Sequence, residues 1–280
     1  VNYSMRQIVS FILLSSMIAL TAKDIYSDSW ALIVGINKYE NVRKLEYSTA
    51  DAIAMRDVLV EKFGFTDEKI TLLLDNDATK DNIIKEFANI ALQAQKNDRV
   101  LVFFAGHGET MDMPSGGQMG YLIPVDGNPD NLYLSAIPMD ELKRLSAMSN
   151  AKHMLYLIDA CYGGILAVGT RALDITKPNY IEKKMEYRGR QIITAGGRDE
   201  EVIEKPEWGH SAFTHNLERG LKNGSADLDH DGYISASSSA GKLELKFIRI
   251  DKLFFIKRPL PVNRIYRFTE YSHRLAVKYI

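Results

Sequence analysis

The sequence predicts an α/β fold, a three-layer sandwich in which helices cover both faces of a mostly parallel central sheet of about six strands. Two patterns support this prediction. Short and almost continuous apolar runs occur at 30–36, 70–74, 99–104, 153–158 and 190–195, as expected for strands buried on both faces. Segments with helical spacing of apolar residues separate most of these runs. Such alternation is typical of βαβ units in one parallel sheet.

The helices are predicted from their spacing and from the residues at their ends. Residues 48–63 carry apolar side chains at helical intervals and stop at Gly64. Thr79 is a suitable N-cap for a helix over 80–95, and Pro138 is suited to begin a helix that runs to about 148. A last helix is expected at 211–221. Residues 111–130 are rich in Gly, Pro and Asp and predict a loop with a short hairpin near 121–123.

Composition sets limits on function. The chain has 280 residues, of which 46% are hydrophobic and 25% are charged, and its formal net charge is -1. These values are ordinary for a globular protein, and the absence of a basic excess argues against a dedicated nucleic-acid binder. Cys161 is the only cysteine, which excludes an intramolecular disulfide framework and a cysteine-cluster metal site.

Both ends of the chain differ from its middle. Residues 1–22 combine a basic residue, an apolar stretch at 8–20 and small residues, a pattern typical of a secretory signal peptide. We therefore expect export to the periplasm or the outside, or a cytoplasmic location if this stretch is an ordinary helix. Residues 242–280 hold ten basic and three acidic side chains. We expect a boundary near 240, with 240–280 either produced by a frameshift or forming a basic, aromatic segment that contacts a membrane or polyanion.

Two unusual peptides end the third and fourth predicted strands. Ala105-Gly106-His107-Gly108 closes one, and a peptide from Asp159 to Gly164, which contains Cys161, closes the other. Ligands of open α/β sheets bind beyond the carboxyl ends of the strands. If these strands are neighbours, His107 and Cys161 face each other across a cleft.

That pair has a chemical use. A thiol with an ordinary pKa of about 8.5 is mostly protonated at neutral pH, and a nearby imidazole can take its proton to create a nucleophile for acyl transfer. The flanking glycines let a substrate backbone approach closely, and the N–H groups of Gly108 and Cys161 can then stabilise an oxyanion. The plainer alternative is a small buried thiol and a structural histidine.

These peptides resemble a known family. Asp-Ala-Cys-Tyr-Gly at 159–163, with a histidine 54 residues upstream, is similar to the caspase signature. Over about 28–236, the chain looks like a caspase-like cysteine peptidase, and the metacaspase-like and bacterial caspase-homologue branch is the most similar. The likeness includes 31–39, 50–52, 103–108 and 210–214. It implies an endopeptidase in which His107 is the general base, Cys161 is the nucleophile, and Gly108 and Cys161 form the oxyanion hole.

The resemblance also bears on specificity. Metacaspases cleave after Arg or Lys and carry Asp two residues before the nucleophile, which Asp159 matches here. Their second pocket acid lies in a Cys-x-x-Asp-Ala peptide, which corresponds to Ser48–Ala52, so Asp51 is the match and Ser48 replaces the cysteine. We expect a substrate pocket from Asp51, Asp159, Ser48 and Ala105. Two carboxylates in one pocket favour a guanidinium; their alternatives are a solvated helix charge and a structural carboxylate.

Calcium is a further possibility. Calcium-activated metacaspases carry an acidic cluster after the His-Gly peptide, but the acids here are dispersed at 109, 112, 126 and 130. Residues 227–238 resemble an EF-hand loop in which Asp227, Asp229, Asp231 and Tyr233 occupy ligand positions, but Ser238 stands where a bidentate Glu is needed. The alternative is an Asp-rich turn. No cofactor is expected to be required for the chemistry.

The sequence therefore predicts a cysteine endopeptidase that cleaves proteins or peptides after Arg or Lys through a thioester intermediate. The basic loop at 165–190 is a candidate for self-processing, with a plain solvated loop as the alternative. Two other functions stay open. One is a peptidase of the same clan with another specificity, as in legumain or clostripain. The other is a caspase-fold binding or signalling module without turnover.

Overall fold

The computed structural model describes residues 26–160, 188–195, 204–224 and 226, and the backbone of three short strands at 233–234, 256–257 and 276–279. The predicted signal peptide, the nucleophile position 161 and most of the loop at 165–190 lie outside these residues. So do Asp227, Asp229 and Asp231 of the predicted calcium loop and most of the basic tail. No helix within the described ranges is long and apolar enough to cross a membrane.

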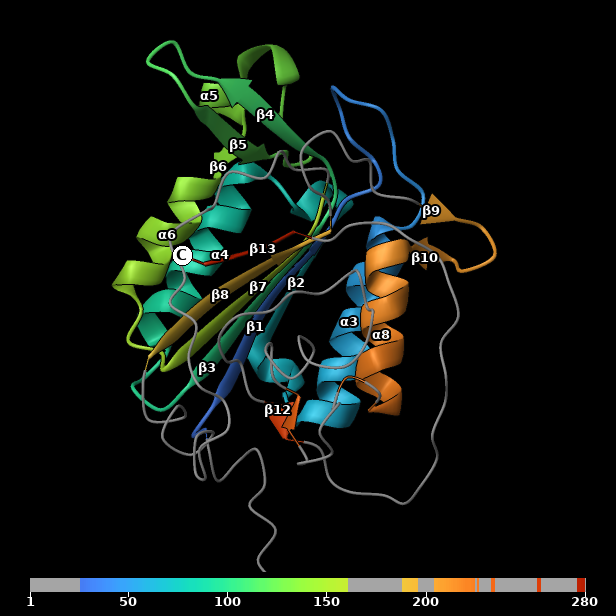
Figure 1. Ribbon diagram of the computed structural model, residues 1–280, viewed down its shortest axis with the longest axis vertical. Coiled ribbons are helices and arrows are strands. Elements are labelled where there is room, and N and C mark those ends of the chain that lie inside the picture. Colours follow the sequence, from blue (N-terminus) through green and yellow to red (C-terminus); the bar gives the residue numbers. More distant parts are fainter. Residues whose placement is uncertain are drawn as a thin grey trace, which may run out of the picture.

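A central sheet of six strands organises the fold, in the order β13-β8-β7-β3-β1-β2. Five of its strands run parallel, and β13 pairs antiparallel with β8 at one edge. The strands are β1 (Ser29–Gly35), β2 (Ile70–Leu74), β3 (Arg99–Ala105), β7 (His153–Asp159), β8 (Gly189–Thr194) and β13 (Ala276–Tyr279). This confirms the predicted α/β sandwich with a mostly parallel sheet, and Figure 1 shows its layers.

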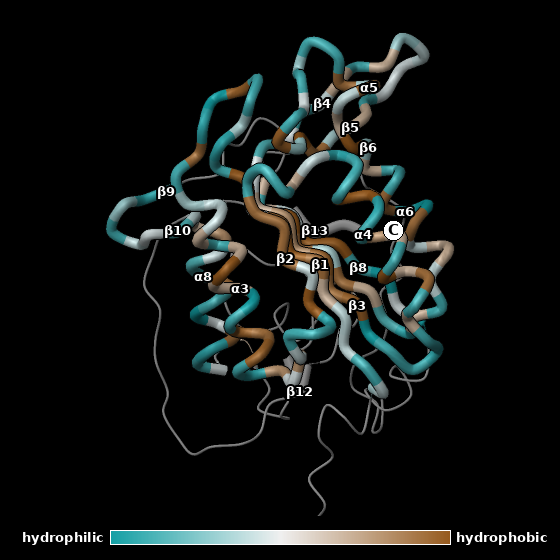
Figure 2. Tube along the Cα trace, turned by 180° about the vertical axis from the view of Figure 1, so that it is seen from behind, coloured by the Kyte–Doolittle hydropathy of each residue, from teal (hydrophilic) through white to brown (hydrophobic). Residues whose placement is uncertain are grey.

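Helices cover both faces of the sheet. They are α3 (Ser48–Phe63), α4 (Lys80–Gln93), α6 (Met139–Met148) and α8 (Ala212–Asn223), with a short α5 (Leu132–Ser135). α3 packs with α8 on one face and α4 packs with α6 on the other (Figure 1). Each face has its own buried apolar cluster, so the strands are apolar on both sides, as Figure 2 shows in brown. This two-sided burial explains the continuous apolar runs of the sequence.

Most of the residues predicted to begin or end helices do so in the structure. The Thr79 hydroxyl accepts a hydrogen bond from the Asn82 N–H at 3.2 Å, which confirms it as the N-cap of α4. Gly64 ends α3 with a φ of 69°, a left-handed conformation that favours glycine. Pro138 differs slightly from its predicted place, because it is the N-cap of α6 rather than its first residue.

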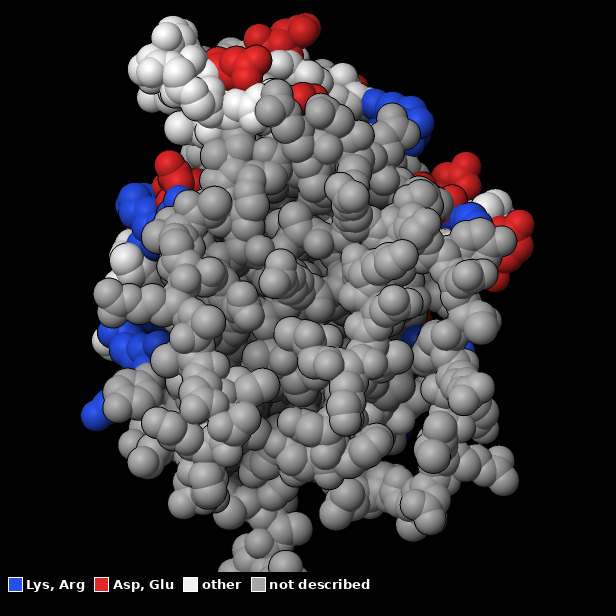
Figure 3. Space-filling model, viewed as in Figure 1, with Lys and Arg blue, Asp and Glu red and all other residues white. Residues whose placement is uncertain are grey.

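The segment predicted as a loop at 111–130 contains more regular structure than expected. A small antiparallel sheet joins β4 (Gly108–Asp112), β5 (Gln118–Leu122) and β6 (Ile137–Pro138). The turn between β4 and β5 uses Gly116 and Gly117 at φ 89° and 85°, and the Gly116 N–H donates to the Met113 carbonyl at 2.8 Å. The glycines that suggested a loop are therefore the turn of a hairpin. Acidic side chains lie at the end of the molecule that carries this hairpin (Figure 3).

The remaining strands are short pairs. β9 (Glu204–Lys205) pairs with β10 (His210–Ser211), and β11 (Tyr233–Ile234) pairs with β12 (Ile256–Lys257). β8 begins at Gly189, one residue before the predicted start of the strand, so the last two positions of the candidate self-processing segment at 165–190 belong to the sheet. Gly189 and Arg190 already pair with His153 and Met154 in the sheet, which corrects that boundary.

One glycine sets the distance between α3 and the sheet. A Cβ at Gly35 would lie 2.4 Å from the Ser48 carbonyl oxygen and 2.6 Å from the Ala52 Cβ. We therefore expect Gly35→Ala to lower the free energy of unfolding by about 1–3 kcal/mol, because overpacking displaces the helix. Urea denaturation measures this change.

Gly220→Ala is a matched control. Gly220 lies in α8 and its added Cβ would meet only the Ala226 Cβ, at 3.4 Å. Alanine is the better helix former, so this variant should be more stable by roughly 0.5–1 kcal/mol. Equal effects of the two substitutions would contradict the close contact at Gly35.

Candidate active site

The pairing of β3 with β7 creates the site. These neighbouring parallel strands place Ala105 opposite Asp159, and the Gly106 N–H donates to the Asp159 carbonyl at 3.1 Å. His107 follows β3 by two residues, and position 161 follows β7 by two residues. The expectation that the two strands are neighbours is confirmed. Both peptides therefore leave the sheet at the same edge, although Cys161 itself lies outside the described residues.

The His107 side chain is held by the loop between β1 and α3. Its Nε2 lies 2.7 Å from the carbonyl oxygen of Arg43, and a carbonyl only accepts hydrogen bonds, so Nε2 carries the proton of the neutral ring. Nδ1 then has the free lone pair. Burial lowers the pKa of His107 below its ordinary 6.5. The ring is therefore neutral at pH 7 and able to accept a proton through Nδ1.

Tyr39 fixes the backbone at the same point. Its hydroxyl accepts a hydrogen bond from the His107 N–H at 2.8 Å, and the two rings pack with centroids 4.9 Å apart. A Cβ at Gly106 would lie 2.3 Å from that hydroxyl, so glycine is required for Tyr39 to reach the chain. Tyr39 lies in the segment 31–39 of the family resemblance, and the structure gives it a direct contact with His107. Trp30, in β1, donates to Asp98.

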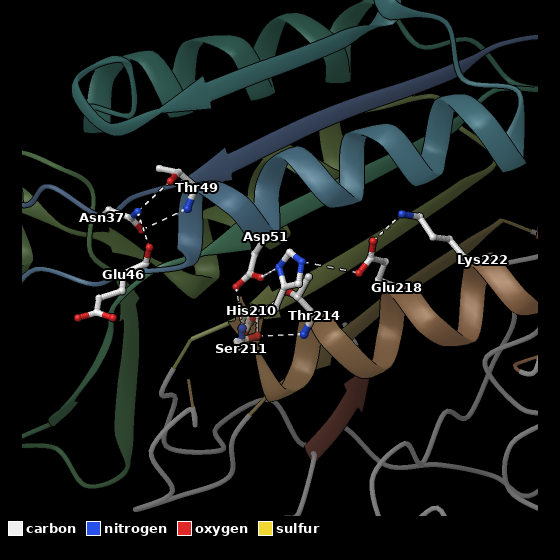
Figure 4. Close-up of polar contacts among 10 residues, drawn as sticks. Asn37, Glu46, Thr49, Asp51, His210, Ser211, Thr214, Glu218 and Lys222 are labelled. Atoms are coloured by element: carbon white, nitrogen blue, oxygen red, sulfur yellow. Dashed lines mark hydrogen bonds and ion pairs between the residues drawn. The ribbon is translucent and has the colours of Figure 1, made fainter. Parts of the chain in front are cut away.

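The loop that carries Arg43 is itself tied down. The Asn37 side chain donates to the Glu46 carbonyl at 3.0 Å and to the Thr49 hydroxyl at 2.8 Å, and it accepts from the Thr49 N–H (Figure 4). The Glu40 N–H donates to the Val125 carbonyl at 3.1 Å. Because its ends are fixed, this loop can hold the imidazole in one orientation.

Gly108 begins β4, opposite Leu122. The Ile123 N–H donates to the His107 carbonyl at 3.0 Å, which makes Gly108 and Leu122 a pair without direct hydrogen bonds in the ladder. The Gly108 N–H therefore points away from β5. This direction is compatible with the predicted oxyanion role, which stays a prediction because the substrate position lies beside undescribed residues.

The two predicted pocket acids come together. Asp51, on α3, is 1% exposed, and Asp159, at the end of β7, is 3% exposed. Ser211 joins them, because its N–H donates to Asp51 Oδ2 at 3.3 Å and its hydroxyl donates to Asp159 Oδ2. Thr214 donates to the same Asp159 oxygen at 2.7 Å. Figure 4 shows this cluster at the start of α8.

One carboxylate oxygen of the cluster has no partner. Asp159 Oδ1 is buried and makes no hydrogen bond with the part of the chain that is described. The pKa of both acids is raised to about 7, mainly by burial and, for Asp159, also by the nearby charge of Asp51. Two buried carboxylates therefore lie together, and one of their oxygens, Asp159 Oδ1, has no hydrogen-bond partner among the described residues.

The other predicted pocket residues are close by. Ser48 is buried one helical turn before Asp51, so both lie on the same face of α3. Ala105 is buried at the end of β3, next to Asp159 in the sheet register. Neither has a polar contact with the two acids among the described residues, and their predicted role in a substrate pocket stays a prediction.

Part of this cluster was not predicted from the sequence. His210, Ser211 and Thr214 lie in a peptide that was noted for its resemblance but was given no role. One local signal was available: serine is a favoured N-cap residue, and Ser211 directly precedes the predicted helix. In the structure the Ser211 hydroxyl caps α8 by accepting a hydrogen bond from the Thr214 N–H at 2.9 Å. Nothing in the sequence indicated that this cap would also bind two buried acids.

The described part of the chain shows no candidate metal site. It contains no group of three or more His, Cys, Asp or Glu side chains arranged to hold a metal ion. Of the predicted calcium ligands, only the backbone of Tyr233 is described, in β11. Calcium binding at 227–238 stays a prediction.

The fold and the site define an α/β protein with a histidine and a pair of buried acids near the carboxyl ends of two adjacent strands. A sequence profile of the caspase domain family matches residues 28–236. The chain therefore belongs to the caspase domain family of peptidases.

Individual relatives agree with this assignment. The chain is 29% identical to metacaspase-7 of Arabidopsis thaliana over 56% of this chain and 41% of the relative. It is 28% identical to metacaspase-1 of Eremothecium gossypii over 48% of this chain and 31% of the relative. The chain thus spans less than half the length of these relatives. The crystal structure of protein GSU0716 from Geobacter sulfurreducens shares the fold, with a TM-score of 0.52, 19% identity and coverage of 70% of this chain and 83% of that one.

The state of His107 can be measured directly. We expect its imidazole to titrate below 6.5 and to carry its proton on Nε2, because it is buried and bonded to the Arg43 carbonyl. Nitrogen-15 NMR of histidine-labelled protein, with His107→Gln for assignment, reports both properties. A pKa above 6.5 or a proton on Nδ1 would contradict the geometry.

The buried acids should affect stability in a pH-dependent manner. The pKa of Asp159 is raised in the folded state, so its favourable contribution is complete below about pH 4 and is lost as the pH rises through about 7. Asp159→Asn removes this buried charge. We expect the variant to be more stable than the wild type by a few kcal/mol at pH 8 and equal to it below pH 4.

Denaturation with urea at several pH values measures this difference. The exposed acid of the β4–β5 hairpin provides the control, because Asp112→Asn should leave the pH dependence unchanged. A wild type that is more stable than Asp159→Asn at pH 8 would contradict the account of an uncompensated buried charge.

Proposed function

We propose that this protein is a cysteine endopeptidase that hydrolyses peptide bonds after Arg or Lys. The observation that carries the proposal is Asp159 Oδ1, which makes no hydrogen bond with the described residues, is buried beside Asp51 and lies two residues before Cys161. A buried carboxylate oxygen in this position suits a substrate with a basic side chain before the scissile bond. Membership of the caspase domain family and the metacaspase relatives support the same reaction.

The acids account for the choice of substrate. A guanidinium presents several N–H donors in a plane and can reach Asp159 Oδ1 while its charge interacts with Asp51. A lysine ammonium offers the same charge with fewer fixed donors. An acidic side chain would meet two carboxylates in a buried place and is excluded by like-charge repulsion. The substrates are therefore proteins or peptides with accessible basic residues.

The chemistry divides between His107 and Cys161. Neutral His107 takes the thiol proton of Cys161 on Nδ1, while its Nε2–H stays bonded to the Arg43 carbonyl. The thiolate attacks the carbonyl carbon of the substrate, and the Gly108 and Cys161 N–H groups stabilise the oxyanion. His107 then gives the proton to the leaving amine, which leaves a thioester on Cys161. Water activated by His107 hydrolyses the thioester and restores the thiol.

The basic loop offers substrates within the chain itself. Arg190 is held in β8, where its guanidinium donates to the Ala151 carbonyl at 2.9 Å and to the Lys152 carbonyl at 3.2 Å. A bond inside a paired strand is protected, so we propose that any self-processing falls before Gly189. A solvated loop without cleavage is the alternative.

Purified protein assayed with fluorogenic peptides ending in Arg, Lys, Asp or Asn, with and without calcium, tests the proposal. We expect cleavage after Arg and Lys that disappears in Cys161→Ala. Asp159→Asn should lower kcat/KM for the arginine peptide by at least about tenfold, the loss expected when a charge-assisted hydrogen bond is weakened.

Asp112→Asn again serves as the matched control and should keep wild-type activity. Cleavage only after Asp or Asn would retain the Cys–His pair and overturn the acidic pocket. A folded protein that cleaves none of these peptides would overturn the enzymatic proposal in favour of a binding or signalling module.

A further inference from the structure

One residue with a side chain adopts an unusual backbone conformation. Asp75 directly follows β2 and has a φ of 45°, the only positive φ among the described residues other than glycine. A left-handed conformation costs free energy for a residue with a Cβ, although aspartate tolerates it better than most. Such strain persists only where surrounding contacts hold it, and it is common at functional sites. The contacts of the Asp75 side chain are therefore informative.

The Asp75 carboxylate binds the chain where it leaves β1. Its Oδ1 accepts hydrogen bonds from the Asn37 N–H at 2.8 Å and from the Lys38 N–H at 2.9 Å. Its Oδ2 lies 3.4 Å from Lys38 Nζ, at the end of a side chain that is 73% exposed. Gly35 and Leu74 are the last register pair of β1 and β2. The carboxylate therefore continues the connection between these two strands after their ladder has ended.

The same N–H groups begin the loop between β1 and α3. The Leu45 N–H donates to the Asn37 carbonyl at 3.0 Å, so residues 37–45 form a closed loop with its base at Asn37. The Asn37 side chain binds the start of α3, and its N–H binds Asp75. Asp75 thus ties the base of the loop to β2, the edge strand of the sheet.

Both contacts that orient His107 come from this loop. The Tyr39 hydroxyl accepts the His107 N–H, and the Arg43 carbonyl accepts the proton of Nε2. Tyr39 directly follows Lys38, whose N–H is bonded to Asp75. A displaced loop would therefore move both acceptors, and misplacing a catalytic group by about 1 Å can cost about a hundredfold in rate.

We infer that Asp75 is a positioning residue for His107, which fixes the loop that holds the imidazole. The left-handed backbone at Asp75 is the geometry that directs its carboxylate to that loop. This inference rests on the proposed function, in which His107 is the general base, and extends it to a residue outside the catalytic pair. Asp75 acts through its two hydrogen bonds to the backbone, because an exposed ion pair such as that with Lys38 contributes little.

Four variants separate the hydrogen bonds from the charge and from the backbone strain. Asp75→Asn removes the charge but keeps an acceptor and a residue type that tolerates a positive φ. Asp75→Gly removes the acceptor and relieves the strain. Asp75→Ala removes the acceptor and leaves a Cβ in the strained conformation. Lys38→Met removes only the ion pair.

Kinetics with the arginine peptide should divide these variants into two groups. We expect Asp75→Gly and Asp75→Ala to lower kcat by about tenfold to a hundredfold, because the base is displaced. Their KM should stay within about twofold of the wild type, since losing an interaction that acts only in the transition state lowers kcat and kcat/KM together. Asp75→Asn and Lys38→Met should keep kcat within about threefold.

A second measurement follows His107 without catalysis. An imidazole N–H that is held in a hydrogen bond is protected from exchange with water. At about pH 8, where the ring is neutral, nitrogen-15 NMR should show the Nε2–H signal of His107 in the wild type and in Asp75→Asn. In Asp75→Gly and Asp75→Ala, this proton should exchange at least about tenfold faster, or its signal should disappear.

Asp77→Ala is the matched control. Asp77 is an exposed acid in the same short turn, and its bond to the Asn82 side chain uses the backbone carbonyl, which the substitution keeps. This variant should behave as the wild type in both measurements. Urea denaturation checks that each variant folds, and Asp75→Gly decides alone if Asp75→Ala does not fold.

The outcomes are distinct. A wild-type kcat and a protected Nε2–H in Asp75→Gly would overturn the inference, because the hydrogen bonds would then be dispensable. Asp75→Asn as impaired as Asp75→Ala would also overturn it, since the charge would then matter, as would a raised KM with an unchanged kcat. A wild type that cleaves none of the peptides would overturn the proposed function, and the Nε2–H measurement would still decide whether Asp75 positions His107.

Discussion

The parallel pairing of β3 with β7 is the constraint on which the site depends. It aligns Ala105 with Asp159, so the two peptides that carry chemistry leave the sheet side by side. Strands in one parallel sheet lie about 5 Å apart, which is the scale needed for a nucleophile and its base to cooperate. Both strands are buried along their whole length, so the end of β3 that precedes His107 is fixed in the core. The contacts of Tyr39 and Arg43 with His107, and of Ser211 with the two acids, all depend on this alignment.

The start of α8 joins the two buried acids near the end of the sheet that carries His107. Ser211 caps the helix through Thr214, and the same residue donates to both buried acids. A helix N-terminus carries partial positive charge and unpaired N–H groups, which stabilise nearby carboxylates. The stabilisation is incomplete, since burial still raises the pKa of Asp51 and Asp159 to about 7. A raised pKa means that the charged form of each acid is destabilised by the fold, which is the property that the proposed binding of a basic side chain would relieve.

Much of this fold could be predicted from the sequence, because strands that are buried on both faces appear in it as continuous apolar runs. The bounds of α3 and β2 agree with the prediction at both ends. The hairpin at β4 and β5 was mostly read as loop, since Gly116 and Gly117 weaken a strand pattern while they form its turn. The contacts of Tyr39 and His210 could not be predicted, because each joins residues that are far apart in the sequence: 68 positions for Tyr39 and His107, and 159 for Asp51 and His210.

The most direct test of the central claim is covalent labelling of the native protein with a thiol-directed peptidyl acyloxymethyl ketone, followed by mass spectrometry. The account predicts that a probe with arginine at the reactive end modifies Cys161, that an equivalent probe with aspartate does not, and that Asp159→Asn slows the arginine probe by about tenfold or more. Equal labelling by both probes, or modification elsewhere than Cys161, would contradict the combination of a Cys–His pair with an acidic pocket.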